Sequence, residues 1–163
     1  MNLKPRLLTT AILVAGLTFS TAQAATVTDS MPVTITIENA CEISTAPTTL
    51  DFGTQGVLSA NIDSLSTISV TCTTAAPYNI GLNGGASGNI NARTMTDGTD
   101  FVGYQLYQES GRTTVWGDTV GSNTMASTGT GVEQYFSVYG RVAPQTTPPA
   151  GTYNDSVTVT VTY

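Results

Sequence analysis

The chain has 163 residues, about the size of one domain, and a formal net charge of −6. It contains no histidine and only five lysine and arginine residues, so the usual metal ligands, proton carriers and phosphate-neutralising groups are scarce. This composition argues against nucleic-acid binding and acid–base catalysis. Charged residues make up only 10% of the chain, which also argues against a helical bundle.

The first 24 residues are predicted to be a secretory signal peptide. Lys4 and Arg6 give a positive start, residues 7–19 are mostly apolar, and Ala22-Gln23-Ala24 is a small-x-small cleavage site. The apolar run is shorter than the roughly 20 residues that a membrane-spanning helix needs. Removing 24 of 163 residues leaves 139, with three arginines against 11 acidic residues and a formal net charge of −8. We expect an exported protein with no membrane span after cleavage.

The segment that follows, residues 25–39, alternates strongly between apolar and polar side chains. Four apolar residues share one face, and their burial would be worth about 1.5–3 kcal/mol each: Met31, Val33, Ile35 and Ile37. The segment is either the ordinary first strand of the domain or a detachable strand that completes another copy's sheet. Asp29 lies on the same face, so the useful apolar stretch starts at Met31. The pattern alone leaves both interpretations open.

The two cysteines, Cys41 and Cys72, are predicted to pair. In an exported protein they meet an oxidising compartment, where a disulfide is the expected state. The bridge would close a loop of about 32 residues and contribute roughly 3–4 kcal/mol in the chain-entropy model. A reactive thiol is the weaker interpretation, because no basic residue lies near either cysteine in the sequence.

The rest of the chain predicts an all-β protein with one domain. Short alternating runs, punctuated by Gly, Asn and Pro, indicate strands at residues 49–52, 66–73, 78–82, 102–106, 132–142 and 157–163. No stretch keeps a helical period. Some seven strands in a chain of this size favour a two-sheet, immunoglobulin-like β-sandwich. Residues 83–100 are expected to be a polar loop or two weak edge strands, and the Pro-rich residues 143–152 a connection outside the sheets.

Other candidate sites have simpler explanations. Asp97-Gly98-Thr99-Asp100 lacks the ligand spacing of a calcium loop and is expected to be a turn. No two carboxylates are brought together by the pattern, so glycosidase chemistry is not predicted; the four considered are Asp51, Asp63, Glu109 and Asp118. Four aromatic residues could form a sugar-stacking face but are better explained as core or cross-strand pairs; they are Tyr104, Tyr107, Trp116 and Tyr139. Arg112 and Arg141 are expected to pair with surface carboxylates.

An ordered set of short motifs runs through nearly the whole chain after the signal peptide. It comprises the alternating segment before Cys41, Leu50-Asp51-Phe52-Gly53, Ile68-Ser69-Val70-Thr71-Cys72, Tyr78 to Gly85, Tyr104-Gln105-Leu106-Tyr107, Gly111-Arg112-Thr113, Trp116-Gly117-Asp118, Tyr139-Gly140-Arg141-Val142 and Pro149 to Asp155 before the last strand. In this order and with this cysteine spacing, the chain resembles the spore coat protein U domain family, which includes pilins of archaic (Csu-like) chaperone–usher systems.

The resemblance implies an immunoglobulin-like sandwich that lacks its last strand and is completed by a donor strand. The donor strand would be the N-terminal segment, with Val27, Met31, Val33, Ile35 and Ile37 as its apolar residues. The acceptor groove of the next subunit would lie beside the last strand, with Val157, Val159, Val161 and Tyr163 as its wall. The disulfide would join Cys41 and Cys72. A periplasmic chaperone would cover the groove first, and an outer-membrane usher would then exchange it for the next subunit.

The implied organisation is a signal peptide at 1–24, a donor segment at 25–39 and a pilin domain at 40–163. The expected function is that of a structural, non-enzymatic fibre subunit without cofactors, exported to the periplasm and then to the cell surface, and supporting attachment and biofilm formation. Two alternatives stay open. One is a coat protein of the same family, and the other is a monomeric secreted adhesion or carbohydrate-binding module.

Overall fold

A computed structural model describes residues 22–163, so most of the predicted signal peptide lies outside the described residues. The described residues fall into two units, 22–35 and Thr36–Tyr163, and each is described by itself. Residues 22–35 form no helix or strand, and all of them are exposed. Within the described residues, no helix has the length and hydrophobicity needed to cross a membrane.

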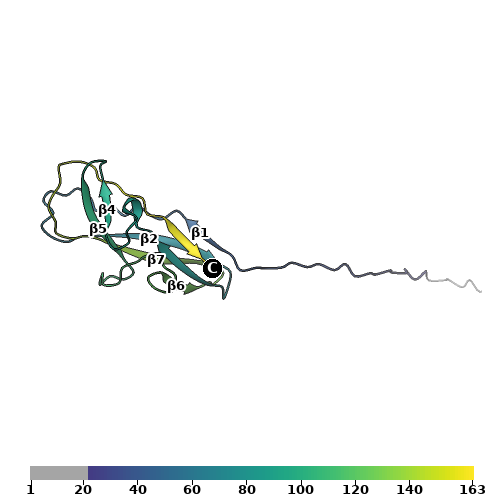
Figure 1. The fold of residues 1–163 in the computed structure, drawn as a ribbon. Helices are drawn as coiled ribbons and strands as arrows, with labels where there is room; N and C mark the ends of the chain where they lie inside the picture. The colour runs from purple at the N-terminus through teal and green to yellow at the C-terminus, as the bar shows by residue number, and fades with distance from the viewer. Residues whose placement is uncertain (1–21) are drawn as a thin grey trace, which may run out of the picture. The chain divides into compact units, whose positions relative to one another are not determined.

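The second unit consists of eight strands and one short 3-10 helix, η1 (Figure 1). The strands form two antiparallel sheets, one of five strands in the order β1-β2-β7-β5-β4 and one of three in the order β6-β3-β8. Their bounds are β1 Cys41–Thr45, β2 Ile62–Cys72, β3 Pro77–Leu82, η1 Gly85–Ser87, β4 Arg93–Thr96, β5 Phe101–Tyr107, β6 Met125–Thr128, β7 Glu133–Val142 and β8 Val159–Thr162. The prediction of an all-β, immunoglobulin-like sandwich is confirmed.

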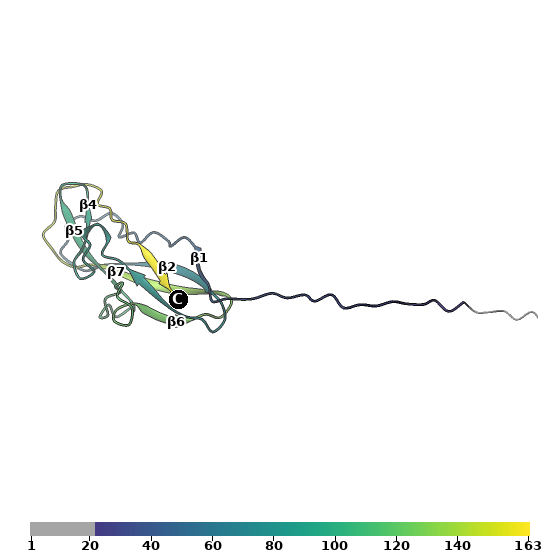
Figure 2. The same ribbon diagram turned by 45° about the vertical axis from the view of Figure 1, so that its right-hand side comes forward.

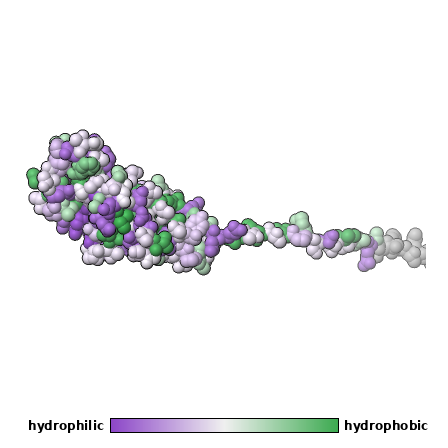
Figure 3. Space-filling view, in the orientation of Figure 1, coloured by the Kyte–Doolittle hydropathy of each residue, from purple (hydrophilic) through white to green (hydrophobic). Residues whose placement is uncertain are grey.

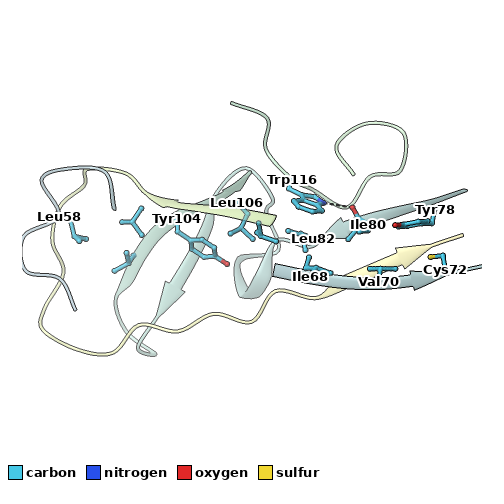
Figure 4. Close-up of a cluster of buried hydrophobic side chains, with 13 residues drawn as sticks. Leu58, Ile68, Val70, Cys72, Tyr78, Ile80, Leu82, Tyr104, Leu106 and Trp116 are labelled. Atoms are coloured by element: carbon cyan, nitrogen blue, oxygen red, sulfur yellow. Dashed lines mark hydrogen bonds between the residues drawn. The ribbon is translucent and has the colours of Figure 1, made fainter. Parts of the chain in front are cut away.

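The core fills the space between the two sheets and follows from the alternation of the strands. Ile68, Val70 and Cys72 of β2 face Tyr78, Ile80 and Leu82 of β3, and all six are buried. The close-up in Figure 4 shows the core continuing from Cys72 and Tyr78 at one end to Leu58 at the other. Trp116 is fully buried among these residues, and its indole N–H donates to the carbonyl of Ile80 (2.8 Å).

The disulfide predicted between Cys41 and Cys72 is present. The two residues lie opposite each other where β1 pairs with β2, so the bridge fastens the edge strand to its neighbour. It also fixes the point at which the N-terminal segment enters the domain.

A buried arginine holds the end of β3 in place. Arg93 has no exposed surface, and its guanidinium donates to four backbone carbonyls and one side chain: Leu82 (2.8 Å), Asn83 (2.9 Å), Ile90 (3.2 Å), Trp116 (2.7 Å) and Gln105 Oε1 (2.6 Å). Burial lowers the pKa of this guanidinium from its ordinary value. Because Leu82 pairs with Val159, Arg93 supports the strand on which β8 is built.

Several predicted elements differ from the structure. Residues 49–52 are not a strand, although the chain beside them bonds to β2 through the amide of Thr48 and the carbonyl of Thr67 (3.2 Å). β1 and β6 were not predicted, because each is only four or five residues long and lacks a clear apolar alternation. The last strand is shorter than predicted, starting at Val159. Residues 83–100 contain η1 and the edge strand β4, and residues 143–152 lie outside the sheets, as expected.

Candidate functional site

β8 has one paired edge and one open edge. It pairs with β3 along Val159 to Thr162, and no other strand of the described residues pairs with it. The carbonyl of Thr158 accepts the amide of Asn83 (3.2 Å), so Thr158 faces β3, and the alternation of an antiparallel strand points the backbone groups of Val159 and Val161 the other way. The side chains of these valines pack against the core and are half-buried. β8 therefore presents apolar side chains and free backbone groups at the same residues.

β1 presents a second open edge of the same kind. Its Cys41 and Ile43 lie opposite the buried Cys72 and Val70, so their side chains point toward the core. The carbonyl of Ala40 accepts the amide of Thr73 (2.9 Å), and alternation then points the backbone groups of Cys41 and Ile43 away from β2. Ile43 is 40% exposed although it faces inward.

The two open edges lie next to each other. β1 is at the end of the five-stranded sheet and β8 at the end of the three-stranded sheet, and the two strands are in contact. Figures 1 and 2 both show β1 beside β8. We call this pair the acceptor edge; its inward side chains are those of Cys41, Ile43, Val159 and Val161. Val157, just before β8, also packs against the core, whereas Tyr163, just after it, is 62% exposed. The alternation of the last strand predicted that Val157, Val159 and Val161 share one face, whereas Ile43, which lies on the same face of β1 as Cys41, was not predicted.

The residues predicted as a donor strand are exposed. Their exposed fractions are 97% for Val27, 83% for Met31, 83% for Val33, 84% for Ile35 and 70% for Ile37. Apolar side chains this exposed are unusual when they recur on alternate residues. Figure 3 shows hydrophobic residues interspersed with polar ones along this segment and on the visible surface of the domain. The described structure assigns no strand between residues 22 and 40.

The aromatic residues do not form one binding face. Trp116 and Tyr104 are buried in the core, as the sequence interpretation favoured. Tyr139 lies on the outer face of β7, opposite Leu65 of β2, and is covered by the guanidinium of Arg112, whose Cζ lies 5.7 Å from the ring centroid. Tyr107 of β5 lies opposite Tyr139, so these two form a cross-strand pair while the other two are buried. The four aromatic residues therefore do not share one surface on which a sugar could stack.

The remaining charged candidates are engaged in local contacts. Asp63 accepts two hydrogen bonds from Arg141 (2.7 and 2.9 Å) and lies 3.2 Å from Arg112, and the bond to Arg141 is the largest cause of its lowered pKa. Glu109 accepts the hydroxyl and amide of Thr113 and the amide of Thr114, which lowers its pKa to about 2.

The loop at Asp97 is a turn and not a metal site. Asp97 accepts the amides of Thr99 and Asp100 (both 2.9 Å), which makes the predicted turn. In the part of the chain that the structure describes, no three His, Cys, Asp or Glu side chains gather closely enough to hold a metal ion.

Comparisons with known proteins assign this sandwich to a family. The fold is that of an all-β, two-sheet sandwich with adjacent open edges. The model of the Spore Coat Protein U domain family matches residues 27–160 of the chain. The chain belongs to this family, which confirms the resemblance. It is 34% identical to Protein U of Myxococcus xanthus over 161 residues, covering 89% of each chain.

A solved structure is also similar. It is a crystal structure of the CsuC-CsuE chaperone-tip adhesion subunit pre-assembly complex from the archaic chaperone-usher Csu pili of Acinetobacter baumannii. One of its chains matches with a TM-score of 0.57 and 27% sequence identity, over 78% of this chain and 40% of that one. This chain thus spans less than half the length of the chain that it matches.

Proposed function

We propose that this protein is a structural subunit of a surface fibre, assembled by the chaperone–usher route through donor-strand complementation. Residues 27–37 of one copy would lie between β1 and β8 of the next. The observation that carries the proposal is that one chain contains two complementary features. One is an exposed segment with alternating apolar residues, and the other is a pair of adjacent open strand edges whose inward apolar residues are incompletely covered. An open edge of this kind is an aggregation hazard unless another strand covers it.

The energetics favour such an exchange. Burial of Met31, Val33, Ile35 and Ile37 would be worth about 6–12 kcal/mol before the cost of ordering the segment. Pro32 has no amide hydrogen, so regular pairing in a central strand is expected to run from Val33 to Ile37, with Met31 at its margin. That length matches β1, which has five residues, and β8, which has four. Asp29 lies beyond the paired stretch.

The partners follow from this mechanism. The matched structure is described as a complex between a chaperone and a subunit, which supports a periplasmic chaperone as the first partner. An outer-membrane usher and further copies of this chain or related pilins would follow. Export would deliver the subunit to the periplasm and then to a fibre at the cell surface, where attachment and biofilm formation are the roles proposed.

A second candidate rests on the family itself. The family takes its name from a spore coat protein, and the similarity to Protein U covers 89% of both chains. Both observations support a coat protein that is deposited as a layer by the same strand exchange. Electron microscopy of the assembled material distinguishes the two, since a fibre and a layer differ in form. A monomeric secreted module is the third possibility and is an outcome of the next experiment.

The test uses the mature chain, residues 25–163, produced with its chaperone and usher and run on denaturing gels without heating. The wild type should give a ladder of multimers that collapses on heating. Ile35→Asp should abolish the ladder, because an unpaired carboxylate buried between two sheets costs several kcal/mol. The matched control, Thr34→Asp, places the same charge on the outward face and should keep the ladder.

Two results would contradict the proposal. If the wild type runs as a single monomer band and Ile35→Asp is degraded, the segment completes its own domain and the protein is a self-contained module. If both variants keep the ladder, the copies associate through another surface.

A further inference from the structure

Residues 38–40, between the last apolar residue of the donor segment, Ile37, and the start of β1, are held by one side chain, that of Thr73. Its hydroxyl accepts the amide of Ala40 (3.1 Å) and donates to the carbonyl of Glu38 (3.1 Å), with the carbonyl of Ala40 as a longer alternative acceptor (3.3 Å). Its own amide donates to the carbonyl of Ala40 (2.9 Å). The amide and the carbonyl of Ala40 therefore both bond to Thr73. Residues 38–40 lie along the end of β2, and the backbone does not reverse direction there.

Thr73 is itself held by a closely packed turn. The amide of Ala76 donates to its carbonyl (3.0 Å), and the amide of Gly131 donates to the carbonyl of Cys72 (3.0 Å). A Cβ at Gly129 would collide with the carbonyl of Thr73, so only glycine allows the loop to approach this closely. The disulfide at Cys72 adds a covalent anchor next to it. These contacts hold Thr73 in one position, and residues 38–40 bond to it there.

This fastening excludes one particular arrangement of the donor segment. For residues 31–37 to cover the acceptor edge of their own chain, the backbone must reverse within residues 38–40. Three residues are enough for a tight hairpin loop, so the length of the connection does not prevent it. The reversal does require Glu38 and Ala40 to leave Thr73, and self-complementation and the Thr73 contacts are therefore mutually exclusive.

We propose that Thr73 is a specificity-determining residue for assembly: by fastening residues 38–40, it keeps the donor segment from completing its own domain and reserves the acceptor edge for a second copy. This inference rests on the proposed function. The occupant of the acceptor edge is the donor segment of another copy, because this chain supplies a segment with the required alternation. Thr73 acts only through the backbone to which it bonds.

The test compares Thr73→Val with Thr74→Val in the mature chain, residues 25–163, oxidised and released from urea at nanomolar concentration. Valine keeps the shape and the backbone amide of threonine but removes the hydroxyl. Thr74 is the matched control, since the structure records no hydrogen bond from its hydroxyl among the described residues. The probe is a fluorescent peptide of residues 27–39. Loss of the hydroxyl contacts to Glu38 and Ala40 should weaken peptide capture about tenfold in Thr73→Val and leave Thr74→Val unchanged.

Hydrogen exchange distinguishes an effect of Thr73 on the position of the donor segment from an effect on the stability of the domain. If the freed segment of Thr73→Val covers its own edge, the amides of Val159 and Val161 become better protected than in the wild type. A variant that is only destabilised loses protection instead. Three glycines inserted after Asn39 provide a second variant that leaves Thr73 intact and gives the chain room to reverse. It should show the same weaker capture and the same gain of protection.

The outcomes separate this inference from the function on which it rests. If the wild type captures the peptide and both variants behave like it, Thr73 does not steer the segment and the inference is wrong, while strand exchange stands. If the wild type captures no peptide at all, the proposed function is wrong. Weaker capture in both variants together with protected Val159 and Val161 amides supports the inference.

Discussion

Residues 33–37 read Val-Thr-Ile-Thr-Ile and residues 157–161 read Val-Thr-Val-Thr-Val, so two parts of the chain share one pattern. The second leads into β8, whose valines pack against the core. The first forms no strand, and its apolar side chains are 70–84% exposed. The difference lies in the neighbours, because β8 has β3 beside it. Alternation determines which side chains share a face, and a partner strand determines whether a strand forms.

The largest expected effect comes from removing the disulfide that holds β1 against β2. Without it, β1 would be held to the domain by strand pairing alone. Replacing both cysteines, Cys41→Ser with Cys72→Ser, should lower the free energy of unfolding by about 3–4 kcal/mol, because the unfolded chain is no longer constrained by the loop that the bridge closes. Urea unfolding of the mature chain measures it. The wild type in reductant should lose a similar amount, and the double variant should not respond to reductant. An unchanged midpoint would contradict the prediction.

The next effect concerns the support beneath β8. Arg93→Met removes a buried guanidinium that serves four carbonyls and a glutamine, and should cost about 3 kcal/mol because those groups lose their donor away from water. Hydrogen exchange should show the amides of Thr160 and Thr162, which face β3, losing protection first. Arg141→Met is the control: its side chain is more exposed and pairs with Asp63 at the surface, so its loss should cost less than about 1 kcal/mol. Equal costs for the two variants would mean that the buried network contributes no more than a surface contact.

The comparison also explains what sequence reasoning could predict. The strong alternation of β2, β3, β5 and β7 predicted these strands and the core between them, and the cysteines predicted their own bridge. Short edge strands such as β1 and β6 have too few residues to carry a pattern, so their existence depends on tertiary pairing. Arg93 could not be recognised as buried, because its five acceptors come from residues distant in the sequence or from backbone carbonyls.

The candidate site was predictable in part for the same reason. The alternation of the terminal valines and the family resemblance predicted a wall of the acceptor groove there, and Val159 and Val161 lie on the open strand β8. Ile43 was not predicted, because it is a single apolar residue in a mostly polar stretch. Its inward orientation follows only from its pairing with Val70. Thr73 was also missed, because a side chain that bonds to backbone atoms 33 residues away leaves no local signal.

A smaller effect is expected where the approach to β8 is tied to β5. The hydroxyl of Tyr104 donates to Asp155 Oδ2 (2.6 Å), and Asp155 also accepts the amide of Ala86 (2.8 Å). Tyr104→Phe should cost about 1 kcal/mol, because it leaves a partly buried carboxylate short of one donor. Tyr107→Phe is the control, since no hydrogen bond of its hydroxyl is recorded among residues 22–163. Thermal unfolding of both variants measures the difference, and equal losses would show that the hydroxyl of Tyr104 contributes nothing specific.

The smallest effect contrasts a carboxylate of the sandwich with one in the exposed segment. Asp63 bonds to Arg141, which lowers its pKa below its ordinary value of 3.8. A carboxyl group whose pKa is lower in the folded state adds stability above its ordinary pKa, and this is lost as the pH falls through the folded value. Asp63→Asn should therefore cost less than about 1 kcal/mol at neutral pH, because the pair is exposed to solvent, and the cost should shrink below pH 4 or so. Asp29→Asn should leave the stability of the monomer unchanged, because Asp29 bonds only to the neighbouring amide of Ser30 among the described residues. Urea unfolding of both variants at pH 7 and pH 3 measures these differences, and a cost for Asp63→Asn that stays constant with pH would assign its effect to packing instead of charge.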